Sequence, residues 1–342
     1  MSITTIAIDT AKSVFQLHGV DAAGTPMLKR GLRRDELLPF FEKQERCVVV
    51  MEACGASHHW GRALIALGHE VRLVPPEATR PFVKKGRKND AADAAAILAA
   101  SRHDVKFVPV KSREQQATLA LHSARTLLVK QRTMLVNAMR GLATEFGLVM
   151  PKGIERLVEL AADVDESLSG EEKRGFGELH ASAAELSLHI EALEKEIVEH
   201  ARRDQLARRL ATVPGIGPIN ASLISATVGG NAGAFRSARQ FAAWLGLVPR
   251  QNSTGGKTRL GRITRAGNSE IRTMLVLGAT SMVYRAGNWN CATGAWVRGM
   301  LARRPAKLVA VALANKLARI AWAVMSRGEV YRADGRRAIA AS

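Results

Sequence analysis

The sequence predicts an α/β domain at the N-terminus, followed by a helical middle region and a mostly helical C-terminal domain. In the first hundred residues, short apolar runs of strand type alternate with helical stretches. From about residue 113 the apolar residues recur with a helical period. The segment 152–200 holds 13 acidic and 5 basic residues, in a chain whose net charge is +19. These changes of pattern divide the chain into three predicted regions, 1–110, 111–205 and 206–342.

The α/β region is predicted one element at a time. A short apolar run ends in Asp9, and the continuous apolar run 47–51, which is typical of a buried strand, ends in Glu52. A turn signal at 21–24 joins two further strands, and a helix ends at Gly68. The predicted elements are strands at 5–8, 14–20, 27–30, 47–51 and 71–74, and helices at 35–44, 57–67 and 91–100. Three successive strands followed by alternating helices and strands is the order of an RNase H-like (RuvC-like) fold, which we therefore expect.

The middle region carries two rows of apolar residues at helical spacing. In the first row the leucines recur every seven residues, and in the second the steps alternate between four and three, as in a heptad seam. The first row is Leu121, Leu128, Leu135 and Leu142, and the second is Leu179, Ala183, Leu186, Ile190, Leu193 and Ile197. This pattern predicts either a helical hairpin within one chain or a coiled coil between two chains. The acidic outer positions argue against a grip on a phosphate backbone.

The charge of the chain indicates a polyanionic partner. Lys and Arg number 50 against 31 Asp and Glu, and the isoelectric point is near 10.6. Such an excess repels itself on a compact surface, so nucleic acid is the expected partner. No apolar run has the length of a spanning helix and the N-terminal residues lack the pattern of a signal peptide, so we expect no membrane partner. The three cysteines lack metal-ligand spacing and fit a reducing cytoplasm.

Four carboxylates form the candidate metal site. Asp9 and Glu52 each follow a predicted strand, at the edge of an α/β sheet where ligands bind. Asp90 and Asp93 lie three apart at the start of a predicted helix and share one face of it. Such hard oxygen ligands suit a pair of Mg²⁺ (or Mn²⁺) ions, which can activate a nucleophile and stabilise the leaving oxygen of a phosphodiester. Taken singly, each of these residues has an ordinary interpretation as a turn residue or helix cap.

A basic run directly precedes the two helical aspartates. Its members are Arg80, Lys84, Lys85, Arg87 and Lys88. A phosphate that reaches the carboxylates would pass these side chains, so the run supports a nucleic-acid site. The alternative is a solvated loop.

A second candidate site lies in the segment 250–268, which surrounds Ser253. This segment has several glycines, which let a backbone approach a ligand closely, and no acidic residue. Its basic residues are Arg250, Lys257, Arg259, Arg262 and Arg265. It is not a Walker loop, because Gln251 stands where that motif needs glycine. A serine among glycines is often a linker residue, but these cations suit a phosphate.

Two further features admit two interpretations each. The turn 214–218 resembles the hairpin of a helix-hairpin-helix module, and it equally fits an ordinary turn between helices. Four tryptophans are candidates for stacking on bases or for core packing. They are Trp244, Trp289, Trp296 and Trp322.

Together these motifs resemble the DEDD transposases of insertion sequences. The matching segments, in order from about residue 3 to 325, are IAIDTAK, VVMEACG, KNDAADA and LGLVPRQNSTGGKTRLGRITRAGN. The resemblance is to the bridge-RNA-guided recombinases of that group, which are related to the pilin-gene inversion recombinases. It implies a RuvC-like domain in which Asp9, Glu52, Asp90 and Asp93 hold the metal and act in catalysis. It also implies that Ser253 attacks DNA and forms a covalent phosphoserine link, while Thr254 stands where many relatives have a second serine.

The same resemblance implies the partners. These are donor and target DNA, a bridge RNA that serves as guide, and further copies of the chain, as a dimer that assembles to a tetramer on DNA. Ser253 would then meet the carboxylates of another protomer in a composite site.

Two other functions compete with this one. In a RuvC-like junction endonuclease, water would be the nucleophile and Ser253 only structural. A non-catalytic protein held on nucleic acid by charge alone would bind with a steep salt dependence and cut nothing.

Overall fold

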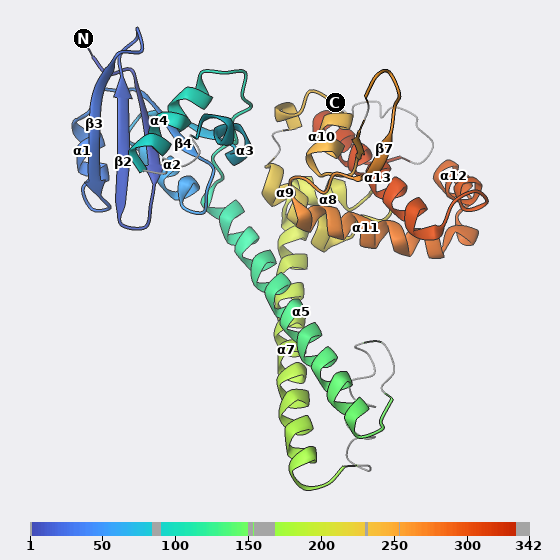
Figure 1. Cartoon of the computed structure of the whole chain (residues 1–342). Coiled ribbons are helices and arrows are strands. Elements are labelled where there is room, and N and C mark those ends of the chain that lie inside the picture. The colour runs from blue at the N-terminus through green and yellow to red at the C-terminus, as the bar shows by residue number, and fades with distance from the viewer. Residues whose placement is uncertain are drawn as a thin grey trace. The chain divides into compact units, whose positions relative to one another are not determined.

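The computed structural model describes residues 2–83, 90–149, 153, 168–229, 232–252 and 254–332, with only the backbone of Asp90 and Ala91. The chain forms two compact units, Met1–Glu114 and Gln115–Ser342, which are described in turn (Figure 1).

The first unit is built on a five-stranded sheet with the order β3-β2-β1-β4-β5. Neighbours β1, β2 and β3 are antiparallel, whereas β1, β4 and β5 are parallel. The strands are β1 (Thr5–Thr10), β2 (Val14–Val20), β3 (Pro26–Arg33), β4 (Val48–Glu52) and β5 (Glu70–Val74). Asp21 shapes the β2–β3 turn, because its Oδ1 accepts the backbone N–H of Ala23 at 3.0 Å and of Thr25 at 2.8 Å.

Helices cover both faces of this sheet, as the alternation of side chains along the strands requires. In β1, Ile6 and Ile8 belong to one buried cluster with Leu37, Phe41, Trp60 and Leu64, and Ala7 belongs to another with Ile97 and Leu98. The helices are α1 (Leu37–Lys43), α2 (Ser57–Ala66), α3 (Pro76–Thr79), η1 (Arg80–Phe82) and α4 (Asp90–Ser101). The α/β class predicted for this part of the chain is confirmed.

In the residues that the structure describes, the regular elements of the second unit are helices and one small β-hairpin. Its elements are α5 (Arg113–Glu145, beginning in the last residues of the first unit), α7 (Gly170–Arg203), α8 (Gln205–Leu210), α9 (Pro218–Val228), η2 (Ala232–Ala234), α10 (Ala238–Trp244), β6 (Pro249–Gln251), β7 (Leu260–Ile263), α11 (Ser269–Tyr284), η3 (Ala286–Asn288), α12 (Ala292–Leu301) and α13 (Ala306–Arg327). The predicted helical character of the chain beyond residue 113 is therefore confirmed.

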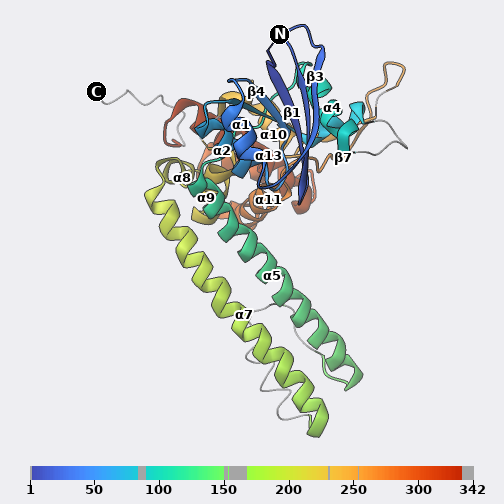
Figure 2. The ribbon, with the colours of Figure 1, turned by 90° about the vertical axis from the view of Figure 1, so that its left-hand side faces the viewer.

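Two long helices, α5 and α7, lie side by side (Figures 1 and 2). Their contact is apolar where Met139 and Ala143 share a buried cluster with Phe176. It is ionic where the Arg125 guanidinium donates to Glu194 at 2.8 Å through Nε. The helices thus pair within one chain, in agreement with the first of the two predicted alternatives.

Of the heptad row predicted for α7, Ala183, Ile190 and Ile197 are buried at steps of seven, whereas the leucines between them are partly exposed. The leucine row predicted for α5 is only partly inside, since Leu142 is 44% exposed. The buried positions of α5 include Val136, Met139 and Ala143 and also polar residues. The buried polar residues Thr118 and His122 lie in the N-terminal half of α5, and apolar periodicity does not predict the burial of polar residues.

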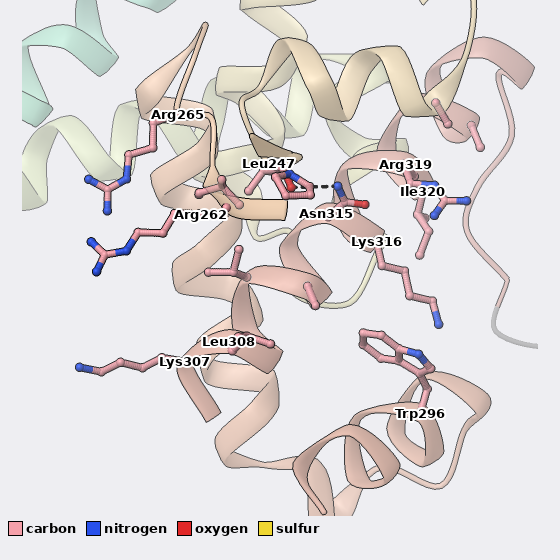
Figure 3. Close-up of a pocket in the computed structure, with 17 residues that line it drawn as sticks. Leu247, Arg262, Arg265, Trp296, Lys307, Leu308, Asn315, Lys316, Arg319 and Ile320 are labelled. Atoms are coloured by element: carbon pink, nitrogen blue, oxygen red, sulfur yellow. Dashed lines mark hydrogen bonds between the residues drawn. The ribbon is translucent and has the colours of Figure 1, made fainter. Parts of the chain in front are cut away.

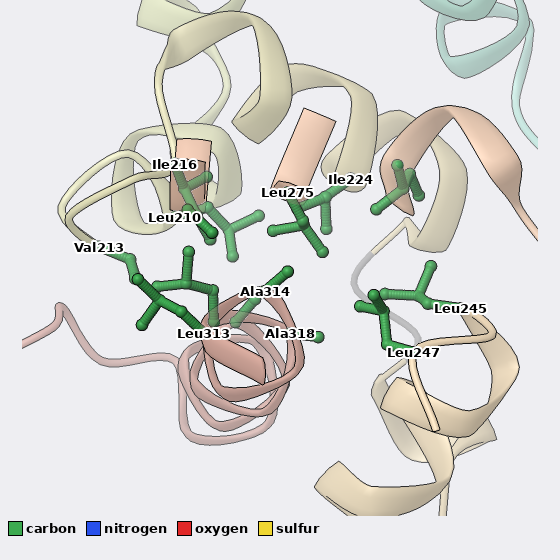
Figure 4. Close-up of a cluster of buried hydrophobic side chains, with 14 of the residues drawn as sticks. Leu210, Val213, Ile216, Ile224, Leu245, Leu247, Leu275, Leu313, Ala314 and Ala318 are labelled. Atoms are coloured by element: carbon green, nitrogen blue, oxygen red, sulfur yellow. The ribbon is translucent and has the colours of Figure 1, made fainter. Parts of the chain in front are cut away.

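The core of the second unit surrounds α13. Figure 4 shows Leu313, Ala314 and Ala318 of this helix facing side chains from the segment 210–224 and from α11. The small residues let neighbouring elements come close. A Cβ on Gly278 of α11 would lie 1.9 Å from the carbonyl oxygen of Gly215, so these two backbones are in direct contact. The first half of the turn 214–218 therefore packs against α11.

The four tryptophans all pack against this core while remaining partly exposed. Trp322 donates its Nε1–H to the Ala232 carbonyl at 3.3 Å. These residues thus take part in core packing, one of the two predicted interpretations, and their exposed parts leave base stacking open.

By length and composition alone, α13 is apolar enough to cross a membrane, with a mean hydropathy of 1.6 over its most apolar window. Lys316 and Arg319 interrupt the apolar residues of this helix, so the prediction that no uninterrupted apolar run has the length of a spanning helix still holds. Half of that window is buried inside the second unit, which is the pattern of a central core helix.

Candidate functional site

The ends of β1 and β4 bring Asp9 and Glu52 to one edge of the sheet. The two strands are parallel neighbours, and their last paired residues are Ile8 and Met51. Asp9 and Glu52 are the next residues along each strand and are both partly exposed. The carboxyl edge of parallel strands is where ligands bind in open α/β sheets. The structure thus places the two carboxylates at the edge of the sheet where the sequence predicted them.

Glu52 is held by a threonine that the sequence did not single out. The Thr79 hydroxyl lies 2.6 Å from Glu52 Oε2, to which it donates, and 2.9 Å from the carbonyl oxygen of Pro76. Thr79 is only 3% exposed, so little water competes for the carboxylate at this point. Its position in the sequence could have indicated this role. Thr79 follows β5, and β5 ends at the same edge of the sheet because Glu52 is paired with Val74.

A second contact ties the two strand ends together. Thr10 Oγ1 and Cys54 Sγ are 3.0 Å apart, one residue beyond Asp9 and two beyond Glu52. The backbone after β4 is also fixed, because Ala53 donates its N–H to the Val74 carbonyl at 2.8 Å. The carboxylates therefore project from an anchored backbone.

Helix α4 carries Asp93 over the same sheet. Ile97, one turn further on, is buried in the cluster that contains Ala7 of β1, and residues four apart share one helix face. The end of α4 lies at the opposite edge, where the Arg102 guanidinium reaches within 3.0 Å of the Cβ position of Gly24 in the β2–β3 turn. The first turn of α4 therefore points toward the edge where Asp9 and Glu52 lie. Asp90 begins this helix, and its side chain lies outside the described residues.

The donor chemistry of this edge suits a hard cation. Carboxylate oxygens are the ligands that Mg²⁺ and Mn²⁺ prefer. Among the side chains that the structure describes, no three His, Cys, Asp or Glu residues gather closely enough to hold an ion. Asp9, Glu52 and Asp93 thus share an edge without forming a closed ligand set, and the fourth predicted ligand, Asp90, is not among the side chains described.

Of the basic run before α4, Arg80 lies in η1 and is exposed. Lys84, Lys85, Arg87 and Lys88 lie outside the described residues.

The second candidate site is the hairpin formed by β6 and β7. Its strands pair Pro249 with Ile263 and Gln251 with Leu260. The tip is closed by a bridge between Thr254 and Lys257. Ser253 lies outside the described residues, between Asn252 and Thr254. All five predicted cations of the segment are exposed, and they are Arg250, Lys257, Arg259, Arg262 and Arg265.

The base of this hairpin is locked to the end of α10. A Cβ on Gly267 would lie 1.8 Å from the Trp244 carbonyl oxygen, which leaves room for glycine alone. The Arg272 guanidinium donates to the carbonyls of Leu245 at 2.8 Å and Ala266 at 2.7 Å. Arg265 has a left-handed backbone with φ of 58°. These contacts hold the base of the hairpin against the end of α10. Arg272 contributes to them, and the sequence motifs did not point to this residue.

Comparison with known proteins identifies a family over both segments that hold the candidate sites. Residues 6–147 match the profile DEDD_Tnp_IS110, described as a transposase, and residues 207–293 match the profile described as "Transposase IS116/IS110/IS902 family". The first profile covers Asp9, Glu52, Asp90 and Asp93, and the second covers Ser253. A DEDD transposase domain implies a divalent metal ion and suggests an RNase H-like fold, which accords with the observed strand order.

Related proteins align over almost the whole chain. A "Probable family 20 transposase" of Pseudomonas aeruginosa is 46% identical over 97% of this chain and 99% of its own length. The transposase for insertion sequence element IS1328 of Yersinia enterocolitica is 40% identical over 96% and 99%. That for element IS1111A of Coxiella burnetii is 37% identical over 96% and 92%. The chain therefore belongs to the IS110/IS116/IS902 family of DEDD transposases, insertion-sequence enzymes that bind and process DNA.

Proposed function

We propose that this transposase cuts and rejoins DNA through a covalent bond between Ser253 and a DNA phosphate. The observation that carries the proposal is the setting of the serine. Its sequence neighbours Asn252 and Thr254 belong to a glycine-rich segment with five exposed cations and no acidic residue between positions 250 and 268. The base of the hairpin is fixed by the glycine contact to α10. Such a surface would hold a scissile phosphate beside the hydroxyl.

In the proposed step, the Ser253 oxygen attacks the phosphorus and loses its proton to a base. One bond from the phosphorus to a sugar oxygen breaks, and that oxygen takes up a proton and leaves as a hydroxyl. Attack by a hydroxyl of another strand reverses the step, which joins the new strand and frees the serine. A serine hydroxyl is a weak nucleophile at neutral pH, so this chemistry needs a nearby activating group.

Asp9, Glu52, Asp90 and Asp93 are the proposed holders of that group, a Mg²⁺ (or Mn²⁺) site. When bound, the ions would supply Lewis acidity that lowers the pKa of the hydroxyl and offsets charge on the phosphate. The residues of the chain would orient the site. Glu52 is held by Thr79, and the ends of β1 and β4 are tied by Thr10 and Cys54.

We further propose a composite centre, because the carboxylates belong to the first unit and the serine to the second. Ser253 of one protomer would serve the carboxylates of another, in a dimer that assembles to a tetramer on donor and target DNA. The region 1–110 would be the RuvC-like catalytic domain, 111–205 the dimerisation region and 206–342 the transposase domain with the serine. The enzyme would work in the bacterial cytoplasm, where its DNA lies.

Target choice would rest on a bridge RNA. The net charge of +19 is large enough to attract both a DNA and an RNA molecule. Specificity that is delegated to base pairing leaves the protein to contact shape and backbone, which agrees with a surface rich in arginine and lysine.

The test is strand exchange between donor and target DNA, with Mg²⁺ and the RNA transcribed beside the reading frame. Ser253→Ala should abolish cleavage and exchange, whereas the neighbouring Thr254→Ala should retain both. A Ser253→Ala protein that still cuts would overturn the serine mechanism and favour the junction-endonuclease alternative, in which water attacks. Omitting the RNA should abolish target choice, and unchanged choice without it would contradict RNA guidance.

A further inference from the structure

A deep groove in the second unit lies between the β6–β7 hairpin, α12 and α13 (Figure 3). Its volume is about 1280 Å³. This exceeds the roughly 300–1,000 Å³ of a typical small-molecule site, so the groove has room for a segment of a chain molecule.

The rims of the groove are cationic on both sides. Arg262 and Arg265 come from the hairpin side, and Lys307, Lys316 and Arg319 come from α13. None of the seventeen described residues that line the groove is acidic. None of the five cations forms an ion pair with any acidic side chain in the part of the chain that the structure describes. Like charges gathered in this way repel one another unless an anion lies between them.

Between the rims the groove is apolar. Leu308 of α13 is 51% exposed and lines the groove, together with Val311 and Ile320 of the same helix. Apolar surface left in water is unfavourable, so the expected ligand has an apolar part as well as a charge. A free phosphate ion or the outer backbone of a duplex would leave this surface uncovered.

Trp296 of α12 adds an aromatic face to the groove. Its ring is partly exposed, and Lys316 Nζ lies 5.0 Å from the ring centroid. The Lys316 ammonium lies over this ring, so a base that stacks there would take its place, and the ammonium would then be close enough to pair with the phosphate of that nucleotide. This arrangement is a common element of single-strand binding sites.

The walls of the groove are held in place by backbone contacts. Asn315 of α13 donates its Nδ2–H to the Leu247 carbonyl at 3.1 Å, which joins the helix to the segment before β6. On the other wall, Arg265 donates its N–H to the Gly246 carbonyl at 3.1 Å. The spacing between the cationic rims is therefore set before a ligand arrives, which lowers the entropic cost of binding.

We propose that this groove binds a single-stranded segment of nucleic acid, with phosphates along the cationic rims and unstacked bases on the apolar floor and Trp296. The proposal goes beyond the function proposed above, because it assigns α12 and α13 residues that take no part in the serine chemistry. A strand of DNA and a strand of RNA present the same phosphodiester and base chemistry here. Binding measurements with DNA and with RNA oligonucleotides distinguish the two.

The test is equilibrium binding of the full-length chain to labelled oligonucleotides of about 12 nucleotides, a length within single-strand site sizes. DNA, RNA and a DNA duplex are compared. Lys307→Glu/Arg319→Glu removes two exposed groove cations. Lys195→Glu/Arg208→Glu is the matched control, because it makes the same charge change at two exposed positions of this unit outside the groove.

The groove variant should bind the preferred single strand at least roughly tenfold more weakly than the control, and its log–log salt slope should fall by about 1.4, or 0.7 for each lost phosphate contact. The strand with the larger loss, DNA or RNA, identifies the source. Equal affinities of groove variant and control would overturn the proposal, as would equal losses for single strand and duplex.

A second pair of variants tests the base contact independently of charge. Trp296→Leu should weaken single-strand binding roughly fivefold or more, whereas Trp296→Phe keeps an aromatic face and should retain most of the affinity. Circular dichroism checks that both variants fold. Because binding is measured without catalysis, an inactive serine or metal site leaves this result unchanged. Equal affinities of the Leu and Phe variants, both folded, would contradict a base stacked on Trp296.

Discussion

The hydroxyl of Thr79 donates a 2.6 Å hydrogen bond to Glu52 Oε2 from a position that is 3% exposed. The bond fixes one carboxylate oxygen at the carboxyl edge of the sheet, and among the described residues none hydrogen-bonds to the other oxygen. Groups that orient metal ligands in this way commonly alter metal affinity when they are replaced. Thr79 is thus the first residue to change in a test of the metal site.

Thr79→Val keeps the shape of the side chain and removes the donor. We expect the Mg²⁺ concentration for half-maximal DNA cleavage to rise about 10- to 100-fold. Thr79→Ser retains the hydroxyl and should stay within a few fold of the wild type. A metal titration of cleavage measures both variants, and a Val variant with an unchanged Mg²⁺ requirement would show that Glu52 does not act through the metal.

Asp9→Asn and Asp93→Asn each remove one negative charge from the proposed metal site at nearly constant volume. Both should lose metal-dependent DNA cleavage while retaining DNA binding, because the amide is a poor ligand for a hard cation. Asp35→Asn makes the same change at an exposed position near Arg33 and should remain active. Cleavage by either site variant at the wild-type rate would refute the metal assignment of that residue.

Gly267→Ala tests the locked base of the serine hairpin. The new Cβ would lie 1.8 Å from the Trp244 carbonyl oxygen, at a φ of 63°. Gly255→Ala is the matched control, because its φ is 55° but nothing lies within 4 Å. The backbone conformation alone should cost about 1–2 kcal/mol in each, and overpacking should cost Gly267→Ala roughly a further 1–3 kcal/mol. Urea unfolding gives the two free energies, and equal losses would contradict the contact.

Buried histidines make stability fall in mild acid. Burial, with a smaller effect of Arg125, lowers the pKa of His122 from 6.5 to about 4, and its Nε2 lies 3.1 Å from Ser222 Oγ. In the first unit, burial and then Lys111 and Arg62 lower the pKa of His58 to about 4. Between these pKa values the unfolded chain binds more protons than the folded chain, so stability rises with pH from 4 to 6.5.

Protonation of His122 therefore lowers the free energy of unfolding as the pH falls. The loss begins near pH 6.5, is complete below pH 4 and amounts to at most about 3 kcal/mol. His122→Gln should flatten the pH dependence of unfolding of the second unit in this range. Urea midpoints are measured from pH 7 to pH 4, and an unaltered slope in His122→Gln would show that the pKa of this histidine is the same in the folded and the unfolded chain.

Much of the first unit was predictable, because β1 and β4 are short apolar runs that end in acidic residues and the turn signal at 21–24 separates β2 from β3. Asp9 and Glu52 could be placed at one edge for the same reason. Thr79 was missed, since a single threonine has no periodicity and its role depends on the pairing of β4 with β5. Arg272 was missed because it acts on backbone carbonyls, which leave no trace in the sequence.

The charged groove shows the same limit. Lys307, Lys316 and Arg319 lie on an α13 helix whose composition is that of a core segment. Their approach to Arg262 and Arg265 follows from tertiary packing through Asn315 and Leu247. The sequence predicts a helix with an apolar side and a cationic side, but it does not predict that the β6–β7 hairpin lies across from the cationic side.

The most direct test of the central claim is to locate the covalent bond. Wild-type protein would be mixed with insertion-sequence end DNA and Mg²⁺, denatured and digested with trypsin, which cleaves after Arg250 and Lys257. The peptide 251–257 then contains Ser253 and Thr254 as its only hydroxyl residues. Mass spectrometry should find a nucleotide phosphate on Ser253. Cleaved DNA with no modified peptide, or with the phosphate on Thr254, would contradict the proposed mechanism.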